Sequence, residues 1–140
     1  MFILDTNILS DFFKGHERIR TRITAAPVER PVVTTVISWF EITSGRFQSL
    51  LKAANREELL VAAERIATSE RELADFTLLP ITDLIADHFE QLLTNKKLKK
   101  IGRPDLLIAC ITLANRATLV TRNTRDFIAI PALKLENWAD

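Results

Sequence analysis

Met1-Phe2-Ile3-Leu4-Asp5-Thr6-Asn7 opens the chain and largely determines which fold its sequence predicts. The apolar run Phe2–Leu4 is typical of a short buried strand, and Ile8–Phe13 continues as one or two helical turns. Asp5 therefore ends a first strand just before a helix, which is where open α/β sheets bind their ligands. A carboxylate at this point also has a purely structural use, because Asp is a favoured helix N-cap.

Short strands and longer helices alternate along the rest of the chain. We expect strands at Phe2–Leu4, Val32–Thr35, Thr77–Pro80, Thr118–Thr121 and Leu133–Leu135. Apolar residues at helical spacing predict helices over His16–Thr24, Ser38–Lys52, Asn55–Phe76, Asp83–Leu98 and Pro104–Arg116. This succession predicts an α/β fold, with a central, mostly parallel five-stranded sheet and helices on both sides.

Length and composition favour one globular domain over residues 1–140, because two domains would each bury too little surface. A net charge of +1 means that any nucleic-acid binding must use a local basic patch. The single cysteine, Cys110, cannot form an internal disulfide, and its apolar neighbours indicate a core position. No apolar run approaches the ~20 residues of a membrane span, and no secretory leader is visible. We therefore expect a cytoplasmic protein.

Further acidic or amide side chains occupy positions comparable to that of Asp5. Glu41 lies near the start of the helix after the second strand, and Asp105 lies in the first turn of a largely apolar helix. Asn123 and Asp126 follow the fourth strand. Each alone is explained by a solvated surface, a helix dipole or a turn. Because the carboxyl ends of parallel strands lie on one side of the sheet, we expect Asp5, Glu41, Asp105 and either Asn123 or Asp126 to converge there.

Clustered carboxylates need a compensating charge, since they repel one another and raise each other's pKa. Mg²⁺ or Mn²⁺ would supply it, because both prefer oxygen ligands and bind through only a few carboxylates. Such a metal can activate water and stabilise charge on a phosphate. His16 and His88 stand alone without zinc-ligand spacing. The acids therefore predict metal-dependent hydrolysis of a phosphodiester.

Four blocks of sequence point to a known family. They are Ile3–Asn7; Thr34–Ser38 followed by Glu41, Ile42 and Gly45; Gly102–Ala109; and Leu119–Phe127, closed by Leu135–Trp138. Each block is weak alone, but their order and spacing are specific and span nearly the whole chain. In these blocks the chain resembles the PIN-domain ribonucleases, and among them the VapC-type toxins of type II toxin–antitoxin pairs.

The resemblance implies a Mg²⁺- or Mn²⁺-dependent endoribonuclease that cuts RNA and so inhibits translation. Its three near-constant acids match Asp5, Glu41 and Asp105, of which we assign Asp5 and Asp105 as metal ligands. The fourth, more variable position holds Asn123, which we favour over Asp126 as the nearer residue. Hydroxyl groups would donate hydrogen bonds to these ligands and orient them, and the candidates are Thr6 and Thr121.

A dense cationic run ends just before Asp105. Its residues are Lys96, Lys97, Lys99, Lys100 and Arg103, and Arg122 flanks the same edge. One interpretation is a solvated helix end, where cations complement the dipole. The other is a rail for the RNA backbone, because Lys and Arg position a nucleic acid through its phosphates.

The resemblance also implies two protein partners, a cognate antitoxin and a second copy of the chain. Trp39, Phe40 and Phe47 cluster on one predicted helix. Core packing is the default for large aromatic residues, whereas exposed ones would suit a dimer face or an antitoxin groove.

Three functions are alternatives to the nuclease: an inactive binding module, a phosphatase and a phosphotransfer receiver. A catalytically inactive PIN-like module that binds RNA or protein has no need of the acids, yet Asp5, Glu41 and Asp105 are all present. A phosphatase of the haloacid dehalogenase type would need a second Asp where Asn7 stands. A phosphotransfer receiver would need paired acids before its first helix, which are absent.

Overall fold

Five parallel strands form one sheet in the computed structural model, which describes residues 1–140. Their order is β3-β2-β1-β4-β5, so the first strand lies at the centre. On either side of β1, Ile3 pairs with Val33 of β2 and with Leu119 of β4. The predicted α/β fold with a parallel sheet is confirmed. The strands are β1 (Phe2–Leu4), β2 (Val32–Thr35), β3 (Leu78–Leu79), β4 (Thr118–Val120) and β5 (Lys134–Glu136).

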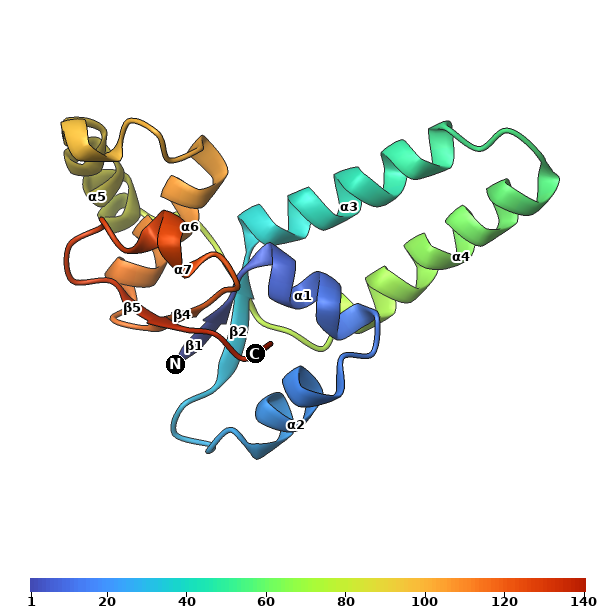
Figure 1. Cartoon of the computed structure of the whole chain (residues 1–140), viewed down its shortest axis with the longest axis horizontal. Helices are drawn as coiled ribbons and strands as arrows, with labels where there is room; N and C mark the ends of the chain where they lie inside the picture. Colours follow the sequence, from blue (N-terminus) through green and yellow to red (C-terminus); the bar gives the residue numbers. More distant parts are fainter.

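Helices cover both faces of the sheet, and two of them project beyond it (Figure 1). One group lies beside β4 and β5, the second lies on the opposite side, and α3 and α4 form a long antiparallel hairpin (Figure 1). None of these helices combines the length and apolar character needed to cross a lipid bilayer. The helices are α1 (Thr6–Phe13), α2 (Glu17–Ala25), α3 (Val36–Leu51), α4 (Arg56–Leu73), α5 (Asp83–Leu93), α6 (Arg103–Ala114) and α7 (Thr124–Phe127), with a 3₁₀ turn η1 (Lys96–Leu98).

Alternation along the strands builds two cores. Ile3 of β1 points into a cluster with apolar residues of α5 and α6, and this cluster includes the buried Cys110. Phe2 and Leu4 point to the other face and pack with residues of α1, α2 and α3. Successive side chains of a strand face opposite sides, so a strand as short as β1 serves both cores. Packing on both faces therefore holds β1 and β4 in place, and with them the residues that follow their carboxyl ends.

Several helix boundaries differ from the predicted ones, and capping explains two of the differences. Helix α3 begins at Val36 directly after β2, instead of at Ser38, because the Thr35 hydroxyl caps it by accepting the Ser38 N–H at 3.1 Å. The predicted helix Asp83–Leu98 ends at Leu93, and a separate turn follows in which Asn95 caps Lys97. The prediction that this helix continues to Leu98 was therefore wrong.

Candidate active site

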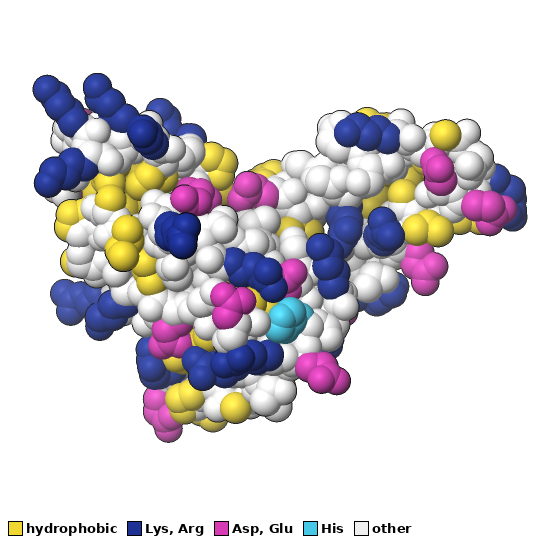
Figure 2. Space-filling view, viewed as in Figure 1, with side chains coloured by type: hydrophobic (Ala, Val, Ile, Leu, Met, Phe, Trp, Pro, Cys, Tyr) yellow, Lys and Arg dark blue, Asp and Glu magenta, His cyan; other side chains and the backbone are white.

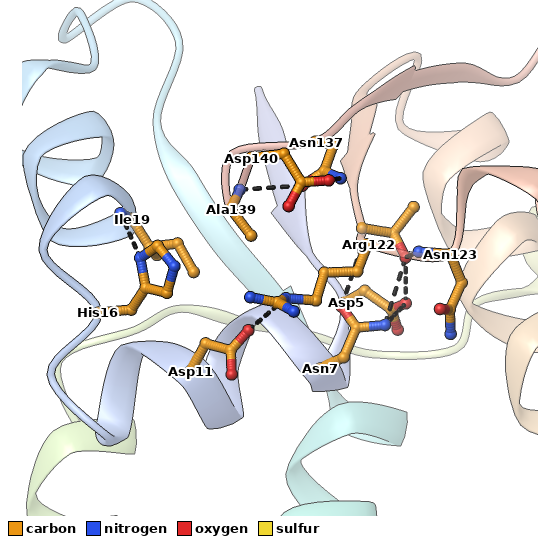
Figure 3. Close-up of polar contacts among 11 residues, drawn as sticks. Asp5, Asn7, Asp11, His16, Ile19, Arg122, Asn123, Asn137, Ala139 and Asp140 are labelled. Atoms are coloured by element: carbon orange, nitrogen blue, oxygen red, sulfur yellow. Dashed lines mark hydrogen bonds and ion pairs between the residues drawn. The ribbon is translucent and has the colours of Figure 1, made fainter.

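Asp5 follows the last residue of β1, at the carboxyl ends of the parallel strands, a side of the sheet that we call the acidic edge. It is almost fully buried, with 3% of its surface exposed. Its Oδ1 accepts the Thr6 N–H at 2.8 Å. Its Oδ2 accepts the Thr121 hydroxyl at 2.7 Å and the Asn7 side-chain N–H at 3.2 Å (Figure 3). Burial raises the pKa of Asp5, the charge of Glu41 adds to the rise, and the hydrogen bonds oppose it.

Asp5 caps helix α1, but the cap involves only one of its two carboxylate oxygens. Asp5 is the N-cap residue of α1, and Oδ1 serves that cap. Oδ2 is held instead from the opposite side, by Thr121 at the end of the neighbouring strand. Hydrogen bonds from both sides fix the orientation of the carboxylate at the sheet edge.

Glu41 reaches the same edge from α3. Its side chain is exposed, and its Oε1 accepts the Thr6 hydroxyl at 2.7 Å. The hydroxyl oxygens of Thr6 and Ser38 lie 3.0 Å apart, so Thr6 links the first turns of α1 and α3. Thr6 is therefore hydrogen-bonded to both acids: its hydroxyl donates to Glu41, and its backbone N–H donates to Asp5.

Asp105 completes the acidic group from the first turn of α6. It is half-buried, and this burial is the main reason that its pKa rises to about 6. The charges of Asp5, Glu41 and Asp126 raise it further. Four acids that are distant in sequence thus act on one another at the predicted edge of the sheet.

The two candidates after β4 are placed differently. The Asn123 backbone N–H donates to the Thr121 hydroxyl at 3.0 Å, while its side chain makes no hydrogen bond (Figure 3). Asp126 is exposed in α7, and its charge contributes to the raised pKa of Asp105. Of the two, only Asp126 adds negative charge to the acidic group.

The donor set fits a hard divalent cation in its chemistry. The group offers carboxylate oxygens, and burial together with the neighbouring charges raises the pKa of Asp105. A bound cation would remove this penalty on the charged carboxylate. No three His, Cys, Asp or Glu side chains stand close enough together to enclose a metal ion. Mg²⁺ does not require such a cage, because it commonly binds through one or two carboxylates plus water and substrate phosphates.

Basic side chains gather at the corner formed by α5, η1 and the start of α6 (Figure 2). Arg103 is the first residue of α6, two residues before Asp105, and its guanidinium lies 5.1 Å from the centre of the Phe89 ring. The other members of the run, Lys96, Lys97, Lys99 and Lys100, are on η1 and the turn after it. This corner is the most concentrated patch of cations in that view (Figure 2).

Arg122 does not belong to this patch. Its Nε lies 2.6 Å from Asp11 Oδ2 on α1, and its backbone N–H donates to the side-chain Oδ1 of Asn7 at 3.2 Å (Figure 3). The Asp11 side chain is only 20% exposed, so the pair is partly shielded from solvent. Arg122 therefore has a structural partner, which the sequence did not indicate.

Other polar residues of the site were not among the predicted ones. Asn7 joins Asp5 to the backbone of Arg122, and Ser38 lies beside Thr6. A signal for both existed: Asn7 is in the same turn as Asp5, and Ser38 is three residues after the cap Thr35. The aromatic cluster divides, since Trp39 packs on a core while Phe40 and Phe47 are about half exposed.

The sheet order and the acidic edge define the class of protein. A model of the PIN domain matches residues 2–133, and the chain belongs to this family. It is 30% identical over 141 residues to "Ribonuclease VapC2" of Rickettsia felis, covering 99% of this chain and 98% of that protein. It is also 30% identical over 143 residues to "Ribonuclease VapC1" of Haemophilus influenzae, with the same coverage. The resemblance stated from the sequence is confirmed.

Solved structures show the same fold. The chain superposes on VapBC-1 from nontypeable Haemophilus influenzae with a TM-score of 0.82 and 25% identity, covering 99% of this chain and 98% of that one. VapBC2 from Rickettsia felis, bound to a DNA fragment from its promoter, gives a TM-score of 0.82 at 24% identity over 98% of each chain. The second likeness concerns the fold alone.

Proposed function

We propose that this chain is a toxin that acts as an endoribonuclease, hydrolysing RNA phosphodiester bonds with Mg²⁺ or Mn²⁺ bound through Asp5 and Asp105. The observation that carries the proposal is the grouping of the acids: Thr6 is hydrogen-bonded to both Asp5 and Glu41. Asp105 belongs to the same group, because its burial and then the charges of Asp5, Glu41 and Asp126 raise its pKa to about 6. Relatives named as VapC ribonucleases along the whole chain support the choice of RNA as substrate. The intact acids argue against the inactive binding module.

The residues around the acids have separate tasks in this proposal. Thr121 and Asn7 hold Asp5 in one orientation, and Thr6 does the same for Glu41. The raised pKa of Asp105 favours its protonated form in the metal-free protein, and a bound cation would lower that pKa. When bound, the divalent cation supplies positive charge that stabilises the phosphate while its bond to the leaving oxygen breaks. Of Asp5, Glu41 and Asp105, only Glu41 is exposed, and it would accept a proton from the attacking water.

Substitution of the acids tests the assignment. Asp5→Asn and Asp105→Asn should each abolish Mg²⁺-dependent RNA cleavage while leaving the fold intact. Asp87→Asn is the matched control, because it removes an exposed carboxylate of α5. Cleavage of a labelled RNA and the thermal midpoint are measured with and without Mg²⁺. Full activity in either site variant would refute the assignment, and binding of RNA without cleavage by the wild type would favour the inactive module.

The basic corner is proposed to bind the RNA backbone beside the acids. Lys96, Lys97, Lys99, Lys100 and Arg103 lie at or just before the start of α6, which carries Asp105. Neutralising Lys99 and Lys100 together should weaken binding of RNA and reduce the salt dependence of the affinity by about two charges. An unchanged salt dependence would remove these lysines from the interface.

The partners proposed for the chain are a cognate antitoxin and a second copy of itself. Support comes from relatives solved as VapBC toxin–antitoxin complexes and from half-exposed apolar side chains on α3, among them Phe40, Phe47 and Leu51. Light scattering at high concentration tests the homodimer. Co-purification with the product of the adjacent gene tests the antitoxin, whose complex should show reduced cleavage; a tight complex with full activity would contradict inhibition.

A further inference from the structure

A polar pocket lies beside the acids, between α1 and α3. Its volume is about 190 Å³, and one end is formed by Thr6 and Glu41, the hydrogen-bonded pair of the acidic edge. The side of this pocket farther along the two helices carries two cations, Lys14 and Arg46. We call it the Lys14–Arg46 pocket; its polar lining also includes Ser10 and the backbone of Gly45.

Helical spacing explains why the pocket leads away from the acids. Thr6, Ser10 and Lys14 are four residues apart, so they follow one face of α1 at about 5.4 Å per turn. Glu41 and Gly45 follow one face of α3 in the same way. The pocket is therefore negative at its Glu41 end and positive one to two turns farther on. An anion is expected at the positive end.

The two cations have no acidic partner within the chain. Neither takes part in any of the ion pairs of the structure, whereas Arg122 is paired with Asp11. Arg46 donates its Nε–H to the hydroxyl of Ser69 at 3.1 Å, and Ser69 is only 3% exposed. This bond orients the guanidinium and leaves its two terminal nitrogens free for an external acceptor. The fold thus positions a charge that it does not itself neutralise.

Gly45 keeps the pocket open. It lies inside α3, where glycine weakens a helix, and a Cβ added to it would meet no atom within 4 Å. Packing therefore does not require glycine at this position. Its effect is to clear the helix face between Glu41 and Ser49, so that a ligand can approach the backbone of α3 closely.

We propose that the Lys14–Arg46 pocket binds a backbone phosphate of the RNA next to the one that is cleaved. This inference rests on the proposed function. The planar guanidinium of Arg46 and the ammonium of Lys14 are suited to phosphate oxygens, and the Ser10 hydroxyl is a further donor. The RNA strand then crosses the acids between two cationic regions, the basic corner before α6 on one side and this pocket on the other. Two anchors fix which phosphate lies at Asp5 and Asp105.

The test uses single-stranded RNA in which one phosphate at a time is replaced by an uncharged methylphosphonate. Binding is measured on the full-length Asp5→Asn protein, which does not cut, so that affinity is separated from cleavage. Lys14→Gln and Arg46→Gln, alone and together, are added to this background. Lys134→Gln is the matched control, because it removes an exposed cation on β5. Gly45→Leu fills the pocket without changing any charge, and the thermal midpoint of each variant verifies folding.

The expected result is a loss of affinity that depends on one position in the RNA. Lys14→Gln with Arg46→Gln should weaken binding at least tenfold, Gly45→Leu should weaken it comparably, and Lys134→Gln should change it less than twofold. The methylphosphonate at one position flanking the cut should weaken binding to the Asp5→Asn protein but have no added effect in the double pocket variant. Equal affinity of the pocket variants and the control, or additive effects at every RNA position, would overturn the inference. Cleavage of RNA by the wild type is measured separately and decides the proposed function.

Discussion

Thr121 and Asp5 are joined by a 2.7 Å hydrogen bond that connects the ends of two adjacent strands. Leu4 of β1 pairs with Val120 of β4, and this register places the next residue of each strand side by side. Both residues are buried, so the threonine hydroxyl replaces water as a donor to the carboxylate.

Thr121→Val should remove this donor while keeping the shape of the side chain. The hydrogen bond lowers the pKa of Asp5, so its loss should raise that pKa and move the acid limb of the cleavage profile to higher pH. The buried acceptor left without a donor should cost about 1–3 kcal/mol of stability. Cleavage at a series of pH values and urea unfolding measure the two effects. Thr121→Ser keeps the hydroxyl, so its cleavage–pH profile should resemble that of the wild type. An acid limb shifted as far in Thr121→Ser as in Thr121→Val would contradict the explanation.

Asp105→Asn should stabilise the metal-free protein at neutral pH. The pKa of Asp105 is about 6 in the folded chain against an ordinary value of 3.8, so the folded state favours the protonated form. Stability from this group is present below about pH 4 and is lost as the pH rises through about 6. Because the side chain is half exposed, the gain of the variant above pH 6 should not exceed about 1 kcal/mol.

Urea unfolding in a chelating buffer at several pH values measures this difference. The gain of Asp105→Asn over the wild type should vanish near pH 4, and Asp87→Asn should show no such pH dependence. Added Mg²⁺ should reverse the order, since a ligand that binds only the folded state stabilises the wild type more. A wild type that is more stable than Asp105→Asn at neutral pH without metal would contradict the origin assigned to the raised pKa.

Asn123 and Asp126 should affect different steps. Asp126→Asn removes one of the charges that raise the pKa of Asp105, so it should lower that pKa and weaken Mg²⁺ affinity severalfold. Asn123→Ala removes an amide that has no partner within the chain, so it should leave Mg²⁺ affinity unchanged and lower the cleavage rate. Mg²⁺ titration by calorimetry and single-turnover cleavage separate the two. If Asp126→Asn were silent in both assays, Asp126 would be only a turn residue.

Arg122→Gln should lower stability more than it lowers RNA affinity. The guanidinium is paired with Asp11, so its removal should cost about 1 kcal/mol. Asp11→Asn combined with Arg122→Gln should cost less than the sum of the two single changes, as expected for partners in contact. Urea unfolding of the four proteins gives the coupling, and RNA binding is compared with that of Lys99→Gln. A larger loss of RNA affinity in Arg122→Gln than in Lys99→Gln would show instead that Arg122 contacts the RNA.

Much of the fold was predictable because hydrophobic patterning carries it. The short apolar runs before Asp5 and around Leu119 are strands, and their parallel pairing follows from the helices between them. The errors lie where local capping overrides periodicity. Thr35 ends its strand and caps α3 at once, and Asn95 stops the helix before the basic run. Propensity does not reveal which of several polar residues will serve as a cap.

The site was predictable only as a set of acids. The end of β1 places Asp5 near Asp105 in the first turn of α6, and that inference needs no side-chain geometry. The pairing of Arg122 with Asp11 depends on how α1 lies against the loop after β4, which is a tertiary contact. Likewise, the pocket with Lys14 and Arg46 depends on the packing of α1 against α3. No spacing within the sequence connects such residues.

The strand order also fixes when the acids can meet as the chain is synthesised. The central strand β1 is made first, but its neighbour β4 begins only at Thr118, so most of the chain must leave the ribosome before that side of β1 is paired. Until then Asp5 has no Thr121 to hold it, and Asp105 lacks the charge of Asp126. The acidic group is therefore assembled only when translation of this chain is nearly complete.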